Sequence, residues 1–189
     1  MLRIGILGAA RIAPSALIKP ARRTGGVVVT AVAARDHDRA LEFARKQGIP
    51  RVIGSYAALV EDPEIDAVYN PLPNGLHGYW TIAALRAGKH VLCEKPFTAN
   101  ADEARAVAEA ANANPGVVVM EAFHYQYHPL TKRLTEIVRS GELGNISKVD
   151  VAFSAPLWKK GDIRYQLALA GGATMDMGCY PVSLLRLLS

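Results

Sequence analysis

The sequence has few cysteines, few aromatic residues and no long apolar run. Two of its 189 residues are cysteines, Cys93 and Cys179, and 7% are aromatic. Two cysteines cannot form the disulfide framework of a small secreted domain, so we expect a protein of the reducing cytoplasm. Apolar stretches such as 27–29 and 117–120 are much shorter than the ~20 residues that span a bilayer, so we predict no membrane span.

The sequence also lacks a strong excess of charge of one sign. Its 22 Lys and Arg residues against 17 Asp and Glu residues give a net charge of +5. The basic residues are scattered among acids, and the densest pair, Arg22 and Arg23, is typical of a solvated helix end, so we predict no nucleic-acid partner. Half of the residues are hydrophobic, which excludes a disordered chain. The length allows one full domain, or one domain and part of another.

What the sequence does contain, from residue 2 to residue 123, is an alternation of short apolar runs with helical patterns. Asp36 and Ser55 are placed to cap two of the helices. Strands alternating with helices predict parallel βαβ units, so we expect residues 1–123 to form a doubly wound α/β domain. The predicted strands cover 2–7, 27–34, 51–53, 66–69, 90–93 and 117–123, and the predicted helices cover 11–19, 37–47, 56–60, 76–87 and 102–113.

Residues 124–189 have a different pattern, which predicts the start of a second, incomplete α/β domain. We expect a helix over 129–140, a strand over 146–154, a long loop through 156–161 and a helical apolar tail. A lone strand is not stable in water, and the tail has no glycine cap. We therefore expect a chain that is shortened relative to its full-length form.

The first predicted strand leads into Gly-Ala-Ala-Arg-Ile-Ala, a variant of the G-x-G-x-x-G fingerprint with alanine at its second and third small positions. Dinucleotide binding needs a tight turn there, close approach of the backbone to a pyrophosphate, and a helix N-terminus that faces this anion. A plain strand-to-helix turn is the alternative. The predicted cofactor contacts of this turn are Gly8, Ala9, Ala10, Arg11 and Ile12.

The end of the second predicted strand bears on the choice of cofactor. An acidic residue there would bind the ribose 2′-hydroxyl of NAD, whereas an arginine suits the 2′-phosphate of NADP. The sequence has Arg35, followed by Asp36 one position too late for the ribose. We interpret Asp36 as a helix cap and Arg35 as a 2′-phosphate ligand, with a solvated surface arginine as the alternative. NADP is therefore the predicted cofactor, and NAD is the second possibility.

Lys95 follows the fifth predicted strand, between Glu94 and Pro96. In an open α/β sheet the ligand crevice lies beyond the carboxyl ends of the strands, so a lysine there can donate a hydrogen bond to a reacting oxygen. Taken alone, an exposed lysine before a turn proline would be the simpler interpretation.

Lys95 is one member of a series of motifs that resembles the glucose–fructose oxidoreductase, inositol dehydrogenase and rhizopine-catabolism (Gfo/Idh/MocA) family. The resemblance covers the whole chain. Tyr180 makes it most similar to the dihydrodiol dehydrogenase-like branch, because inositol dehydrogenases carry histidine there. In chain order the motifs are the Gly8 turn, Pro73-Asn74-Gly75-Leu76-His77, Glu94-Lys95-Pro96, Met120-Glu121-Ala122-Phe123 with His128-Pro129, and residues 171–180.

The resemblance implies a Rossmann domain followed, over 124–189, by the beginning of a substrate and oligomerisation domain, and a homo-oligomer in the full-length form. It implies that Lys95 is the active-site lysine, that the bond to Pro96 is cis, and that Asp176 and Tyr180 occupy the second and third catalytic positions. It also implies that Asn74 and His77 line the cofactor; loop packing is an alternative role for His77. Leu72, Glu94 and Lys95 itself complete the predicted cofactor-binding set, and we predict no metal site.

These residues suit hydride transfer between a nicotinamide and a sugar, polyol or dihydrodiol-like alcohol or carbonyl. Tyr180 would take the hydroxyl proton if the Lys95 ammonium lowers its pKa from about 10. Asp176 and Tyr180 share a face if the segment is helical, although Pro181 predicts a distorted turn. A carboxylate in the first turn of a helix is the alternative role for Asp176. The alternative function is a non-catalytic dinucleotide-binding module.

Two positions stand out against the family pattern. Gln126 stands where relatives commonly carry arginine, before the His-Pro pair. Arg164 is a candidate for facing the substrate, with a surface position as the alternative.

Overall fold

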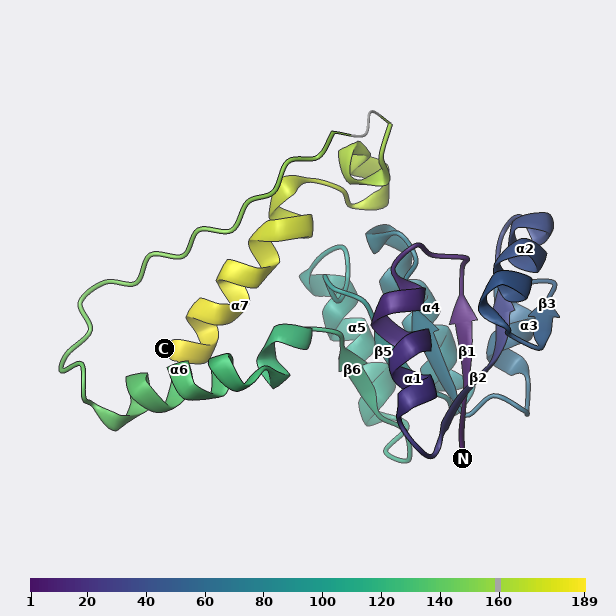
Figure 1. Ribbon diagram of the computed structural model, residues 1–189, viewed down its shortest axis with the longest axis horizontal. Coiled ribbons are helices and arrows are strands. Elements are labelled where there is room, and N and C mark those ends of the chain that lie inside the picture. The colour runs from purple at the N-terminus through teal and green to yellow at the C-terminus, as the bar shows by residue number, and fades with distance from the viewer. Residues whose placement is uncertain (159–160) are drawn as a thin grey trace. The chain divides into compact units, whose positions relative to one another are not determined.

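The computed structural model describes residues 1–158 and 161–189, which form two compact units, Met1–Glu121 and Ala122–Ser189 (Figure 1). The first unit contains one sheet of six strands in the order β3-β2-β1-β4-β5-β6, and every neighbouring pair is parallel. This order confirms the predicted Rossmann fold. The strands are β1 (Leu2–Leu7), β2 (Val27–Ala33), β3 (Arg51–Ile53), β4 (Ala67–Asn70), β5 (His90–Cys93) and β6 (Val119–Glu121).

Helices cover both faces of this sheet, and each face has its own apolar core. The side chains of successive strand residues point to opposite faces, so Val68 packs on one side and Tyr69 on the other. The core on the Val68 side also contains residues of α3, α4 and α5. The core on the Tyr69 side contains residues of α2 and of the helical turn Pro14–Ile18, which precedes α1. The helices are α1 (Lys19–Arg23), α2 (His37–Gln47), α3 (Tyr56–Glu61), α4 (His77–Arg86) and α5 (Ala101–Asn112).

The helix ends follow the capping residues of the sequence. The Asp36 carboxylate accepts a hydrogen bond from the Arg39 N–H at 3.0 Å, and the Ser55 hydroxyl accepts one from the Ala58 N–H at 3.0 Å. Gly48 ends α2 in the left-handed conformation, with φ +61°. The two predicted N-caps are thus confirmed.

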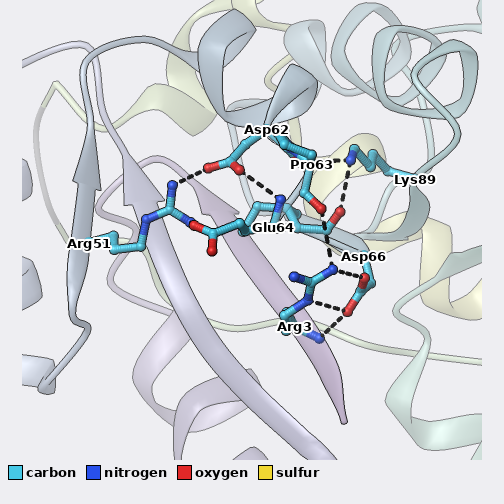
Figure 2. A network of polar contacts seen from close by, with 8 residues as sticks. Arg3, Arg51, Asp62, Pro63, Glu64, Asp66 and Lys89 are labelled. Carbon is cyan, nitrogen blue, oxygen red and sulfur yellow. Dashed lines mark hydrogen bonds and ion pairs between the residues drawn. The ribbon is translucent and has the colours of Figure 1, made fainter.

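A network of charged groups joins the amino ends of the strands (Figure 2). Arg3 binds the Asp66 carboxylate through Nε and Nη2, at 2.9 and 2.6 Å. These hydrogen bonds hold the pKa of Asp66 well below its usual range. The buried Lys89 ammonium donates to the carbonyl oxygens of Asp62 and Ile65, at 2.7 and 2.8 Å. Each buried polar group here therefore has a partner, and the start of β4 is tied to β1 and β5.

The second unit contains α6 (Pro129–Ser140) and α7 (Cys179–Leu188), joined by extended chain and short helical turns. The predicted helix over 129–140 is confirmed, and Gly141 ends it with φ +76°. The predicted strand over 146–154 is wrong, because the described residues of this unit form no strand. A strand needs a hydrogen-bonded neighbour, and no other described segment of this unit supplies one. The predicted loop through 156–161 includes residues 159 and 160, which lie outside the described residues.

Two helical segments begin with a wide π turn and continue through a proline. The turns are Pro14–Ile18, before Pro20, and Thr174–Gly178, before Pro181. Proline has no N–H, and its ring clashes with the carbonyl four residues earlier, so a wider turn relieves the clash. The first helical segment consequently runs to Arg23 rather than ending at residue 19 as predicted, and the predicted distortion near Pro181 is confirmed.

Among the residues that the structure describes, none of the helices combines the length and the apolar character needed to cross a bilayer.

Candidate active site

Three loops of the first unit meet at the carboxyl edge of the parallel sheet. The Gly8 turn follows β1, residues 71–76 follow β4, and Lys95 follows β5. Since β1 and β4 are neighbours and the chain winds outward from them in both directions, their carboxyl ends form the topological switch point of the sheet. Ligands of open α/β sheets bind at this point.

The Gly8 turn has the backbone that a dinucleotide requires. Gly8 has φ +86°, and a Cβ at this position would lie 3.0 Å from the Leu72 side chain. Its N–H donates to the Ala33 carbonyl at 2.6 Å, so the turn begins directly at the end of the sheet ladder. Ala9 and Ala10 follow, and their methyl side chains are small enough for a ligand to approach the backbone closely. The residues of this segment thus fit a bound dinucleotide.

The arginines after β2 lie next to this turn in the fold. Arg35 is exposed immediately after the strand, and Asp36 is occupied as the cap of α2. Arg39, in the first turn of α2, donates from Nη2 to the Ala9 carbonyl at 2.9 Å. This contact ties the start of α2 to the glycine turn.

His77 connects the loop after β4 with the turn after β5. Its Nε2 lies 2.7 Å from the Leu72 carbonyl oxygen, and its Nδ1 lies 2.7 Å from the Pro96 carbonyl oxygen. The ring is only 1% exposed. Burial lowers the pKa of His77, although both hydrogen bonds to carbonyl groups favour the charged ring. Both nitrogens are therefore engaged by the protein, which favours the loop-packing alternative for this residue.

Asn70, the last residue of β4, shapes the same loop from inside. Its side chain is fully buried and donates to the His77 carbonyl and to the Thr81 hydroxyl, both at 3.2 Å. Its amide oxygen accepts from the Leu72 N–H at 3.4 Å. Asn74 is half-buried at the start of a short 3₁₀ turn that leads into α4. The loop after β4 is thus held by buried amide hydrogen bonds.

The segment that carries Lys95 is anchored to β4. The Glu94 N–H donates to the Asn70 carbonyl at 3.0 Å, and the Tyr69 hydroxyl donates to the Glu94 carboxylate at 2.6 Å. Burial, together with the Glu94 carboxylate, raises the pKa of Tyr69, so its hydroxyl remains a donor. The bond between Lys95 and Pro96 is cis, as the resemblance implies.

Glu121, the last residue of β6, is a half-buried acid at the same edge. Burial raises its pKa to about 6, although a hydrogen bond from the Phe97 N–H acts in the opposite direction. Glu121 pairs with Cys93 in the ladder between β6 and β5, which places it beside the Lys95 segment.

Replacing this acid should change how stability depends on pH. Between about pH 4.5 and pH 6 the folded protein binds a proton at Glu121 that the unfolded chain releases, so stability falls as the pH rises through this window. Glu121→Gln should remove this dependence and, allowing for solvent screening, stabilise the protein at pH 8 by about 1 kcal/mol, or roughly 2–4 °C in Tm. Thermal unfolding at pH 5 and pH 8 tests this, and equal pH slopes in the two proteins would contradict it.

In the second unit, aromatic rings surround Tyr180. Its ring centroid lies 5.4 Å from that of Phe123, 6.0 Å from that of His124, 6.0 Å from that of Tyr125 and 5.1 Å from that of Phe153. The contacts with Phe123, His124 and Phe153 are edge-to-face, and packing of this kind holds a ring in one orientation. The segment after β6 and the start of α7 together determine where the Tyr180 hydroxyl points.

Gln126 stabilises the same arrangement. Its side-chain amide donates to the Ser183 hydroxyl at 3.2 Å, and the Tyr125 hydroxyl donates to the same oxygen at 2.7 Å. At the position where relatives commonly carry arginine, this chain therefore uses a neutral side chain to bind α7.

Asp176 is held by an arginine from the preceding loop. Arg164 binds the Asp176 carboxylate through Nε at 2.9 Å and the buried Asp162 carboxylate through Nη1 at 3.1 Å. Burial opposes its charge, but the hydrogen bonds to both acids raise the pKa of Arg164 above its usual value. A Cβ on Gly171 would lie 2.6 Å from the Arg164 carbonyl oxygen, so only glycine lets the loop close. Arg164 is therefore a partner of Asp176.

Comparison with known proteins decides the family of this chain. Residues 2–123 match the sequence model of the GFO/IDH/MocA oxidoreductase family with its NAD-binding Rossmann fold, and residues 131–189 match a GFO/IDH/MocA C-terminal domain. The chain belongs to the Gfo/Idh/MocA oxidoreductase family. The resemblance stated from the motifs is thereby confirmed.

Two curated relatives and one solved structure illustrate the similarity within the family. D-xylose 1-dehydrogenase (NADP(+)) 2 of Haloferax volcanii is 49% identical over 98% of this chain and 57% of that protein. Trans-1,2-dihydrobenzene-1,2-diol dehydrogenase of Xenopus laevis is 33% identical over 85% of this chain and 48% of that protein. The crystal structure of a 3-ketoreductase from Actinomadura kijaniata, with NADP and TDP-benzene, superposes with a TM-score of 0.91 at 37% identity, over 99% of this chain and 57% of that one. The chain spans about half the length of the relatives it matches.

Motif analysis missed several residues that shape the site. Arg39 and Asn70 donate hydrogen bonds to backbone carbonyl groups, and such contacts produce no recognisable sequence motif. Glu121 lies within the motif Met120-Glu121-Ala122-Phe123, and an acidic residue in a predicted buried strand was the signal that could have identified it. The Arg164 contact with Asp176 depends on a loop closure across Gly171 that no spacing rule predicts.

Proposed function

We propose that this chain binds NADP and supplies the catalytic residues for hydride transfer between the nicotinamide and an alcohol or carbonyl carbon of a sugar, polyol or dihydrodiol-like substrate. The observation that carries the proposal is the arrangement at the switch point. The Gly8 turn, the loop after β4 and Lys95 occupy one edge of the sheet, and His77 joins the second of these to the third. This arrangement can present a cationic side chain to a substrate oxygen beside a bound dinucleotide.

In this proposal two side chains act at the reacting oxygen of the substrate and a third orients the substrate. When bound, the cofactor would supply the hydride as NADPH or accept it as NADP⁺. The Lys95 ammonium donates a hydrogen bond to the oxygen, and the Tyr180 hydroxyl exchanges the proton that must leave or arrive there. Asp176, fixed by Arg164, orients the substrate hydroxyl groups. Substrate names among the relatives, D-xylose and a cyclic dihydrodiol, support an alcohol carbon flanked by hydroxyl groups.

The preference for NADP is assigned to Arg35. Its exposed guanidinium after β2 supports recognition of the 2′-phosphate, and Asp36, which caps α2, is not available to bind the ribose. The Haloferax volcanii relative carries NADP(+) in its name, and the Actinomadura kijaniata structure contains NADP.

Arg35→Gln should weaken NADPH binding about 10- to 100-fold and leave NADH binding within about twofold, because only NADPH carries the 2′-phosphate. Fluorescence titration with both nucleotides measures the effect. Arg23→Gln is the matched control, since it removes an exposed arginine from the last turn of α1. An equal loss of affinity for both nucleotides, or a loss in the control, would contradict the assignment.

A further inference from the structure

The peptide group between Pro96 and Phe97, directly after Lys95, is held on both sides by side chains from other elements. Its carbonyl oxygen lies 2.7 Å from Nδ1 of His77, the first residue of α4. Its N–H donates to the carboxylate of Glu121, the last residue of β6. The C=O and N–H of one peptide group point in opposite directions, so two partners on opposite sides prevent the peptide plane from rotating.

The next carbonyl along the chain is also engaged. The Cys93 thiol donates to the Phe97 carbonyl oxygen at 3.6 Å, and burial raises the pKa of Cys93 to about 12, so it remains a thiol donor. Three elements, α4, β5 and β6, therefore converge on two successive residues after Lys95. A turn that only reverses the chain at the surface can leave its peptide groups to water, whereas these peptide groups are hydrogen-bonded by side chains of three other elements.

The second nitrogen of His77 links this turn to the cofactor edge. Nε2 lies 2.7 Å from the carbonyl oxygen of Leu72, and the Leu72 side chain lies against Gly8. A carbonyl oxygen accepts and cannot donate, so the neutral ring makes one of these two hydrogen bonds, the charged ring makes both, and the remaining contact of the neutral ring is close packing. The Glu94 carboxylate raises the pKa of the ring and the Lys95 ammonium lowers it, so both charges act on His77. The buried His77 ring thus sets the distance between Leu72, which contacts Gly8, and Pro96, which follows Lys95.

We propose that His77 and Glu121 are positioning residues for Lys95: together they fix the Pro96–Phe97 peptide, and through it the direction in which the lysine side chain leaves the sheet edge. The inference rests on the proposed catalytic role of Lys95. Neither residue contacts the substrate in this scheme.

A matched pair of substitutions at His77 tests the inference. His77→Asn places a donor near the position of Nδ1 and keeps the Pro96 contact, whereas His77→Gln reaches only toward the position of Nε2 and loses it. His77→Gln should lower kcat about 10- to 100-fold with little change in KM for NADP⁺, and His77→Asn should recover most of this loss. Activity is followed as NADPH formation with D-xylose.

A second measurement reports on Lys95 without turnover. Competitive acetylation with acetic anhydride, read peptide by peptide by mass spectrometry, compares the labelling rate of Lys95 with that of the exposed Lys46 on α2. In His77→Gln the rate at Lys95 should change at least threefold, with Lys46 unchanged. A loss of helix or sheet stability alone would alter both lysines.

Substitutions at Glu121 test the inference independently, and they remain informative if a His77 variant fails to fold. Glu121→Gln retains an oxygen acceptor for the Phe97 N–H and should leave Lys95 labelling unchanged, whereas Glu121→Ala should alter it. Wild-type labelling and kcat in both His77→Gln and Glu121→Ala would overturn the inference, and loss of activity in Lys95→Ala would show that the proposed function still stands. Full activity in Lys95→Ala would instead overturn the proposed function.

Discussion

Lys95→Ala is expected to lower kcat for hydride transfer about 100- to 10,000-fold, with the affinity for NADPH changed by less than about threefold. The reason is the place of Lys95 in the chain, directly after β5 at the carboxyl edge of the sheet and not within the Gly8 turn that would receive the pyrophosphate. From there its ammonium can stabilise charge on a substrate oxygen. An interaction made in the transition state and absent from cofactor binding lowers kcat while leaving the nucleotide affinity unchanged.

The measurement combines NADPH fluorescence titration with steady-state NADPH formation from a panel of pentoses, hexoses and cyclic diols. Lys46→Ala, at an exposed position of α2, is the control for removing one positive charge. Tyr180→Phe should cause a loss of similar order, because it removes the proposed proton carrier while keeping the ring within its aromatic surroundings. Nucleotide binding without turnover of any panel member by the wild-type chain would favour the non-catalytic dinucleotide-binding module.

Gly8→Ala is expected to weaken NADPH and NADH binding alike, by about 10- to 100-fold. Gly8 has φ +86°, and the added Cβ would lie 3.0 Å from the Leu72 side chain, on the turn that the pyrophosphate must approach. The substitution therefore both strains the backbone and fills space that a dinucleotide needs.

Gly26→Ala separates these two effects. Gly26 has almost the same backbone, with φ +83°, but no atom lies within 4 Å of its Cβ position, and it precedes β2 at the other edge of the sheet. Both variants should lose about 1–2 kcal/mol of stability from the left-handed backbone, and only Gly8→Ala should lose nucleotide affinity. Fluorescence titration and thermal unfolding of the two variants make the comparison, and equal nucleotide binding in both would refute the role given to the Gly8 turn.

The sequence could predict the Rossmann half of the chain because that half is specified by local patterns. Apolar runs bounded by turn residues mark buried parallel strands, and Asp36 and Ser55 mark helix starts through hydrogen bonds only three residues away. The error at 146–154 has the opposite cause. Its alternating pattern is typical of a strand, but a strand exists only through a partner, and no described segment of the second unit provides one.

The sequence by itself thus determined the α/β architecture of the first unit, the glycine turn and the family, and it supplied the catalytic residues as candidates. Only the tertiary structure showed that the His77 ring is shared between Leu72 and Pro96, that Glu121 reaches the Phe97 N–H, and that Arg164 binds Asp176. The physical reason is the separation along the chain of the residues that interact. Periodicity and capping act within a few residues of the chain, whereas these contacts join backbone groups and side chains brought together by sheet order and loop closure.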